Sequence, residues 1–153
     1  METLNYEAEL KRVFDRIEET REAVLATSSK DNPTVRFVSI IFYDNKIFFQ
    51  TGIDLIKYEQ ICENKNVALC FGNVQIEGIA NILGKPTEHD KFIEIFEKQH
   101  KNSFETYSKL DKEILIEIML KKITIYEYDK NRNPYRIFID LDNKKSHKKM
   151  YLE

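Results

Sequence analysis

The stretch TVRFVSIIFYDNKIFFQTG (residues 34–52) constrains the fold more than any other part of the sequence. It is rich in β-branched and aromatic residues over 34–43 and again over 46–51, a composition that favours strands. The two segments are separated by Asp44-Asn45, a two-residue connection typical of a β-hairpin. Most of the first segment is apolar on both faces, so we expect that strand to be covered on both sides.

Arg36 is the charged residue inside this apolar strand. Burying a guanidinium group is costly unless an anion pairs with it, so the sequence predicts an anionic partner. Two partners are compatible with the pattern. One is a bound anionic ligand, and the other is an acidic side chain such as Glu77 on another strand.

On both sides of this hairpin, the sequence predicts strands with a few helices between them. Apolar residues at a spacing of three to four predict helices, and alternating or continuous short apolar runs predict strands. The helices are expected at 4–21, from after Gly52 to about 63 with Asp54 as N-cap or first-turn acid, and at 88–99. The further strands are expected at 23–29, 67–71, 74–83, 121–128 and 134–141, and the segment 103–117 fits either a short helix or a loop. This pattern predicts a mainly β fold, a six- to seven-stranded antiparallel barrel with flanking helices.

The composition excludes several classes of function. The chain has 153 residues, which suits one domain, and we expect that domain over 1–141 with a basic tail at 142–153. It has only 4 glycines and contains neither GxGxxG nor a P-loop. A balance of 24 basic and 26 acidic residues argues against nucleic-acid binding. No apolar run reaches about 18 residues and no signal-peptide core is evident, so we expect no membrane partner and a cytoplasmic location. The cysteines and histidines show no metal-ligand spacing.

An ordered series of motifs over residues 23–84 resembles the pyridoxamine 5′-phosphate oxidase-like superfamily of FMN-binding split barrels. The motifs are LATSS-x₃-P-x-VRFVS, then FFQTG with Lys57 beyond it, then QICENKNVALCF, and finally NVQIEGIA leading to LG-x-P. The resemblance implies a split barrel. It also implies a homodimer with the sites at its interface, and FMN as the commonest cofactor.

The resemblance also implies roles for individual residues. It assigns Arg36 to the flavin side and Lys57 to the flavin phosphate. The backbone around Val38 and Ser39 would flank the isoalloxazine ring, and Thr51 and Gly52 would lie under the ribityl-phosphate. Asn73 stands where relatives often carry a glutamine, an amide able to contact flavin or phosphate. The implied cofactor-binding set is Arg36, Val38, Ser39, Thr51, Gly52, Lys57 and Asn73.

The sequence departs from the founding oxidases at two phosphate-binding cations. Ile56 replaces an arginine next to Lys57, and Ile41 replaces a lysine. The C-terminal substrate-binding segment of those enzymes finds no match over 134–153. We therefore do not expect oxidation of pyridoxamine phosphate.

Three readings of the function remain after these comparisons of motifs. The first is an FMN-dependent oxidoreductase that exchanges electrons with a small-molecule donor and acceptor, without a dedicated acid or base. The second is a non-catalytic protein of the same fold that binds or senses flavin or haem. The third is an interaction protein whose cofactor site has decayed. FAD, haem and a deazaflavin stay open as alternatives to FMN.

Overall fold

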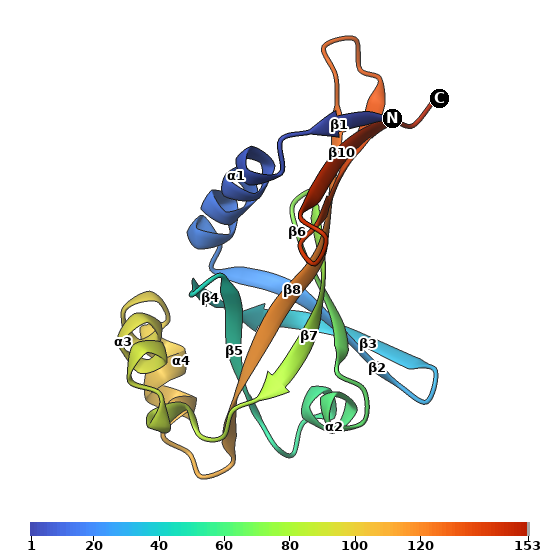
Figure 1. The fold of residues 1–153 in the computed structure, drawn as a ribbon. Helices are drawn as coiled ribbons and strands as arrows, with labels where there is room; N and C mark the ends of the chain where they lie inside the picture. The colour runs from blue at the N-terminus through green and yellow to red at the C-terminus, as the bar shows by residue number, and fades with distance from the viewer. Residues whose placement is uncertain (153) are drawn as a thin grey trace.

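The computed structural model describes residues 1–152, which form one ten-stranded antiparallel sheet with helices at its faces and ends (Figure 1). The strands are β1 (Glu2–Leu4), β2 (Glu22–Ser29), β3 (Asn32–Ser39), β4 (Ile41–Tyr43), β5 (Lys46–Gly52), β6 (Asn66–Phe71), β7 (Val74–Ile82), β8 (Glu113–Tyr128), β9 (Pro134–Asp140) and β10 (Lys145–Met150). The helices are α1 (Tyr6–Glu19), α2 (Ile56–Glu63), α3 (Asp90–Gln99) and the short α4 (Lys101–Ser103), with a 3-10 turn at Pro86–Glu88 and a π-helical turn at Phe104–Ser108.

Strand β8 is the spine of the sheet. Its sixteen residues pair with β7 along most of their length, with β5 over the first half and with β9 over the second half. The full order is β1-β10-β9-β8-β7-β6-β2-β3, while β4 pairs with β5. Because this path ends at β1 and β3, the sheet is not closed. The mainly β split-barrel class expected from the sequence is confirmed, with more strands than the six or seven expected.

Three segments differ from the sequence-based expectations. The strand expected over 34–43 is broken at Ile40, whose backbone N–H donates to the Arg21 carbonyl, and this break separates β3 from β4. The ambiguous segment 103–117 divides between helical turns and the first part of β8. Within the segment from 142, residues Lys145–Met150 form β10, which pairs with β9 and β1.

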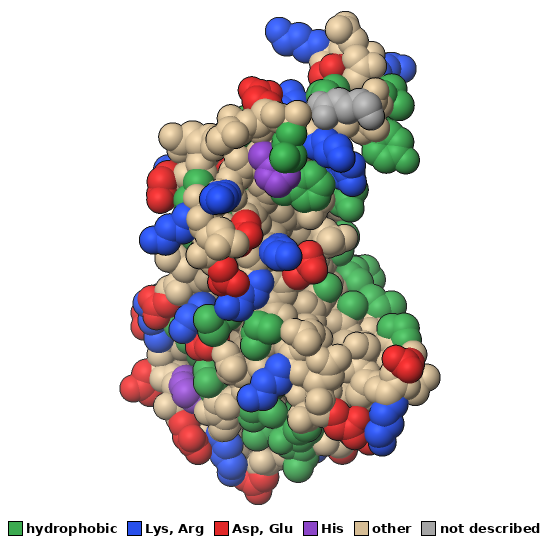
Figure 2. Space-filling model, turned by 45° about the vertical axis from the view of Figure 1, so that its right-hand side comes forward, with side chains coloured by type: hydrophobic (Ala, Val, Ile, Leu, Met, Phe, Trp, Pro, Cys, Tyr) green, Lys and Arg blue, Asp and Glu red, His purple; other side chains and the backbone are tan. Residues whose placement is uncertain are grey.

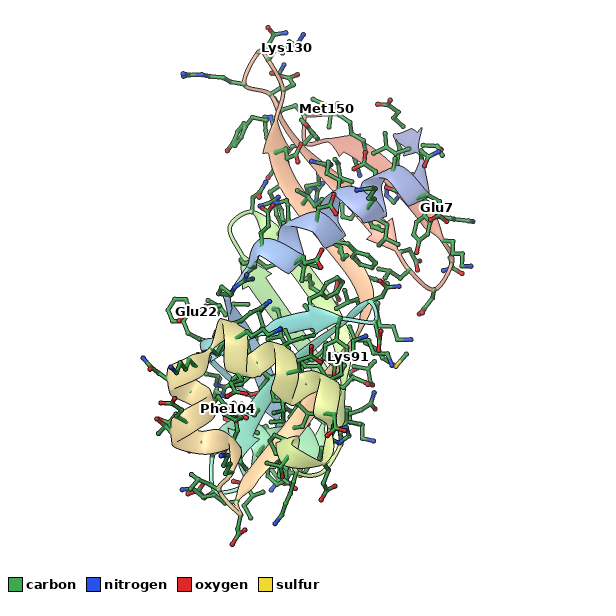
Figure 3. All side chains as sticks on the ribbon, turned by 90° about the vertical axis from the view of Figure 1, so that its left-hand side faces the viewer. Glu7, Glu22, Lys91, Phe104, Lys130 and Met150 are labelled. Carbon is green, nitrogen blue, oxygen red and sulfur yellow. The ribbon has the colours of Figure 1, made fainter. Side chains whose placement is uncertain are left out.

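Two apolar clusters hold the helices against the sheet. Helix α1, capped by the Asn5 side chain at Ala8 N (2.9 Å), buries Val13 and Ile17 completely in the main cluster. A second cluster lies between α3, the π-helical turn and the sheet. Figure 3 shows this helical segment, labelled at Lys91 and Phe104, against the sheet. The buried members of this second cluster are Ile41, Phe48, Phe92, Phe96, Phe104 and Leu115.

A bulge beside Gly78 lies where the other edge of β8 passes from β5 to β9. The pairing of β7 with β8 shifts register between Glu77 and Gly78, as the mid-strand glycine suggests. A Cβ at Gly78 would lie 2.6 Å from Ile118 Cγ2 and 2.7 Å from the Met119 carbonyl oxygen. The second neighbour is backbone of the same spine strand, so it has little freedom to move away.

We expect Gly78→Ala to destabilise the protein by about 1–3 kcal/mol, because the added methyl group overpacks the β7–β8 contact. Glu77→Ala is the matched control, since Glu77 is exposed on the same strand. Its expected effect is within about 0.5 kcal/mol. Chemical denaturation of both variants gives the free energies of unfolding. Equal stability of the two variants would contradict the close packing at Gly78.

Candidate functional site

A groove of about 450 Å³ opens where the ends of β3 and β5 meet the start of α2. Its floor comes from the two strand ends, one side from the turn before α2 and the start of β8, and the other side from the helical segment after β7. The residues that line it are Phe37, Val38, Ser39, Gln50, Thr51, Gly52, Asp54, Leu55, Lys57, Phe96, Ser103, Tyr107, Lys112 and Glu113. The groove thus joins segments up to about 75 residues apart in the chain.

Five of the seven residues predicted to bind a cofactor line this groove. They are Val38, Ser39, Thr51, Gly52 and Lys57. The break at the end of β3 and the β4–β5 hairpin bring them together. The hairpin turn has positive φ at both central residues, 52° and 60°, which suits the twist of its strands.

The other two predicted residues lie outside the groove lining. Asn73 is at the β6–β7 turn, where its side chain accepts from Arg16 (2.8 Å) and donates to the Tyr126 carbonyl (2.7 Å). The structure therefore gives Asn73 a bridging role between α1 and β8. Arg36 lies on β3 beside the groove, one residue before its lining begins.

Arg36 is held by neutral oxygens. Its guanidinium donates to the Thr27 hydroxyl (2.8 Å), to the Thr34 hydroxyl and to the Leu25 carbonyl (3.3 Å). Across residues 1–152, no acidic side chain lies within ion-pair distance of it. Glu77, the alternative partner, is on β7, where it lies opposite Lys122 of β8. Burial lowers the pKa of Arg36 below its ordinary value, so the folded chain leaves this charge uncompensated.

Gln60 fixes the position of Arg36 through the two threonines. Each hydroxyl, Thr27 and Thr34, donates to Gln60 Oε1 at 2.6 Å, which leaves its lone pairs to accept from the guanidinium. Gln60 Nε2 donates in turn to the Asn32 carbonyl (2.8 Å). This buried amide therefore ties α2 to the β2–β3 hairpin. Nothing in the sequence distinguishes it from an ordinary helix glutamine.

Lys57 is the second cation of the site. It lies in the first turn of α2 and is half-buried at the groove. Burial is the main cause that lowers its pKa, the nearby charge of Arg36 is the next, and Glu113 opposes both. Within the described chain no carboxylate approaches Lys57 to ion-pair distance. Two like charges are thus held near one another at one end of the groove.

The turn before α2 differs from the sequence-based expectation. Helix α2 begins at Ile56 with Leu55 as N-cap, and the cap makes no side-chain hydrogen bond. Asp54, expected as the N-cap or a first-turn acid, lies before the cap and accepts from Lys112 Nζ at 3.1 Å, and this contact is the main cause that lowers the Asp54 pKa. The Asp54–Lys112 pair is exposed and joins the turn to the start of β8.

Glu113 is a buried carboxyl group that the motifs did not reveal. It is 5% exposed, pairs with Gly52 in the β5–β8 ladder and lines the groove. Burial raises its pKa, with Lys57 and then Lys112 opposing that shift. The signal for it was an acid at the head of the apolar run ILIEIML, within the segment that fitted either helix or loop.

Gln60→Ala is expected to lower the free energy of unfolding by about 1–3 kcal/mol, because Thr27 and Thr34 lose their common acceptor in a buried setting. Gln99→Ala, at an exposed position near the end of α3, serves as the control and should be within about 0.5 kcal/mol of the parent. Thermal or denaturant unfolding measures both. A Gln60→Ala protein as stable as the control would mean that the network does not hold the hairpin.

Comparisons with known proteins identify the family. The family model described as pyridoxamine 5′-phosphate oxidase matches residues 10–127. No curated protein matches the chain by sequence. Three solved structures of similar fold are ChuZ from Campylobacter jejuni (TM-score 0.74, 15% identity, 94% of this chain and 63% of that chain), the haem storage protein HutZ from Vibrio cholerae (0.61, 14%, 77% and 92%) and an FAD-binding protein from Mesorhizobium loti (0.60, 16%, 79% and 93%). At these identities the structural matches show the fold. The family model spans most of the chain and covers the strands from β2 to β8, except the last residue of β8, so the protein belongs to the pyridoxamine 5′-phosphate oxidase family.

Proposed function

We propose that this protein is an FMN-dependent oxidoreductase that binds the flavin phosphate through Arg36 and Lys57. It would act as a cytoplasmic homodimer on a small-molecule electron donor and acceptor. The observation that carries the proposal is the pair of cations beside one groove, neither of which has a carboxylate at ion-pair distance within residues 1–152.

A phosphate group fits these two cations. Held near one another, Arg36 and Lys57 repel, and a bound dianion would relieve both that repulsion and the cost of their burial. Charge-assisted hydrogen bonds from guanidinium and ammonium groups are among the strongest that a phosphate receives. The first turn of α2, which carries Lys57, adds backbone N–H groups and the positive end of the helix dipole.

The planar ring of a flavin fits the remainder of the groove. Strand β3 ends the sheet and pairs only with β2 among the described strands, so alternate backbone groups of its outer edge have no partner strand. Such an edge near Val38 and Ser39 can bond the polar edge of a heterocycle. Tyr107, which is 49% exposed, supplies aromatic surface on the opposite wall.

When bound, the flavin supplies the electron-transfer chemistry itself. The chain then has to hold the phosphate, bond the ring through the β3 edge and exclude water with the aromatic wall. No acid or base is required from the protein, which agrees with a groove lined by one buried carboxyl group and no histidine.

The same groove could serve a non-catalytic flavin carrier, and the family fold also includes a haem storage protein. The histidines give haem less support here. His89 Nε2 bonds the Leu83 carbonyl and His100 Nε2 bonds the Ile40 carbonyl, each at 2.8 Å, while His147 stacks on Phe138. Two cations that have no carboxylate at ion-pair distance within residues 1–152 favour a phosphate-bearing ligand, so flavin is the better fit.

A homodimer is supported by apolar side chains exposed near the groove. On β3, Val35 is 64% and Phe37 is 74% exposed, and Phe37 also lines the groove. Figure 2 shows hydrophobic side chains gathered on the lower part and the right-hand side of one face. Large exposed apolar residues beside a ligand groove are typical of an interface that completes the site.

The double variant Arg36→Ala, Lys57→Ala is expected to lose at least about 2 kcal/mol of FMN binding, roughly 30-fold, because two charge-assisted contacts are removed. Arg21→Ala, Lys65→Ala removes two exposed cations away from the groove and is the matched control. Quenching of flavin fluorescence measures the affinity. Unchanged FMN affinity in the first variant would refute the site assignment.

The absorbance spectrum of the purified protein tests the choice of cofactor and of function. We expect the bands of oxidised flavin, or their appearance on reconstitution with FMN, followed by bleaching with a nicotinamide donor and return with an acceptor. A haem spectrum would contradict the flavin proposal. Flavin that is bound but never reduced or reoxidised over a panel of donors and acceptors would favour the carrier.

Phe37→Glu is expected to convert the dimer to a monomer, because a charge would be placed in the apolar contact. Sedimentation or light scattering reads the oligomeric state, and Glu59→Gln, at an exposed position on α2, is the control. A Phe37→Glu protein that stays dimeric would place the interface elsewhere.

A further inference from the structure

Glu113 occupies an unusual position for an acid. The residue is only 5% exposed, yet it lines the groove together with Lys57. Its Oε1 lies 3.7 Å from the point where a Cβ on Gly52 would be, so the carboxyl group borders the strand end expected under the ribityl-phosphate. Over residues 1–152, no hydrogen bond within 3.5 Å fixes this carboxyl group.

Three charged groups face Glu113 from the elements around it. They are Lys57 from α2, Lys112 from the residue before β8 and Asp54 from the turn before α2. Lys112 is engaged by Asp54 at 3.1 Å. Lys57 is therefore the cation left to compensate Glu113, and it is also the cation proposed to bind phosphate.

A count of charges brings these two roles into conflict. A phosphate monoester carries a charge of about −1.5 to −2 at neutral pH. Arg36 and Lys57 together balance such an anion only if Glu113 is neutral. With Glu113 ionised, the site would hold an excess of negative charge in a half-buried groove, which is costly.

We propose that Glu113 sets the charge state of this anion site, being ionised beside Lys57 in the free protein and taking up one proton from solvent when a dianionic phosphate binds. This inference rests on the proposed flavin phosphate site. It makes Glu113 a specificity-determining residue for anions. A dianionic phosphate binds favourably only when the Glu113 carboxylate takes up a proton.

The direction of the pH dependence follows from this coupling. Burial raises the pKa of Glu113 in the free protein while Lys57 opposes the rise, and a bound anion would offset Lys57 and raise the pKa further. Between the free and bound pKa values, FMN affinity falls as pH rises, by at most about tenfold per pH unit for one proton. Below the free value and above the bound value, Glu113 contributes no slope.

Titration calorimetry of FMN with the whole chain measures the coupling directly. At one pH, buffers of different ionisation enthalpy give the number of protons taken up, and the pH is then varied from about 6.5 to about 8.5, above the second phosphate pKa of about 6. The parent should take up as much as one more proton than Glu113→Gln, and at the upper pH the variant should bind FMN at least about tenfold more tightly. The slope that remains in the variant belongs to Lys57 and the phosphate.

Glu117→Gln is the matched control, since Glu117 lies on the same strand but pairs with Lys46 (3.4 Å) and Asn81 outside the groove. It should keep the proton uptake of the parent. Equal uptake in the parent and in Glu113→Gln would overturn the proposal. Weaker FMN binding by Glu113→Gln at every pH would overturn it too, because the carboxylate would then be a direct acceptor for the ligand.

A second readout separates this proposal from the proposed function. In protein labelled with ¹³C at the glutamate carboxyl groups, NMR titration gives the Glu113 pKa with and without inorganic phosphate. An upward shift with phosphate supports the proposal even if FMN fails to bind, a result that would refute the flavin assignment alone. No shift with phosphate overturns the role of Glu113, whatever FMN does.

Discussion

The whole molecule depends on the backbone pairing of β8. A strand of sixteen residues is roughly 50 Å long, and none of its neighbours pairs with it over its whole length. It shares one edge with β7 and divides the other between β5 and β9. The bulge beside Gly78 lies between these two halves, where a Cβ would come within 2.7 Å of the Met119 carbonyl oxygen. The first half of β8 pairs with β5, whose end lines the groove. The second half pairs with β9, which in turn pairs with β10.

The groove itself shows a division between positioning and charge. Neutral groups position Arg36, through a relay from its guanidinium to Thr27 and Thr34 and on to Gln60. This arrangement gives the arginine neutral acceptors for its Nη1 and Nη2 groups but leaves its positive charge without an acidic partner. Burial of an uncompensated charge costs stability, and functional sites are where proteins tolerate that cost. The electrostatics of the site, more than its shape, therefore point to an anionic ligand.

The family assignment and the site analysis support different parts of the conclusion. The family model and the structural matches establish the fold and the lineage, and that fold includes proteins whose names mention FAD and haem storage. The choice of a phosphate-bearing flavin comes instead from Arg36 and Lys57. The resemblance implies that Ile41 and Ile56 stand where the founding oxidases carry further cations, so a phosphate held by Arg36 and Lys57 would have fewer charged partners, with Glu113 as an additional neighbour.

The sequence by itself determined the local elements and five of the residues that line the groove. Composition and alternation predicted the hairpin around Asp44-Asn45 and the helices α1 and α3, because these features are set by residues close together in the chain. Ordered motifs placed Val38, Ser39, Thr51, Gly52 and Lys57, which the fold brings together. Only the tertiary structure decided the partners of Arg36, the bridging contacts of Asn73, the pairing of β10 and the burial of Glu113. Each of these depends on contacts between distant segments, and no pattern in neighbouring residues encodes which oxygen or which strand lies opposite.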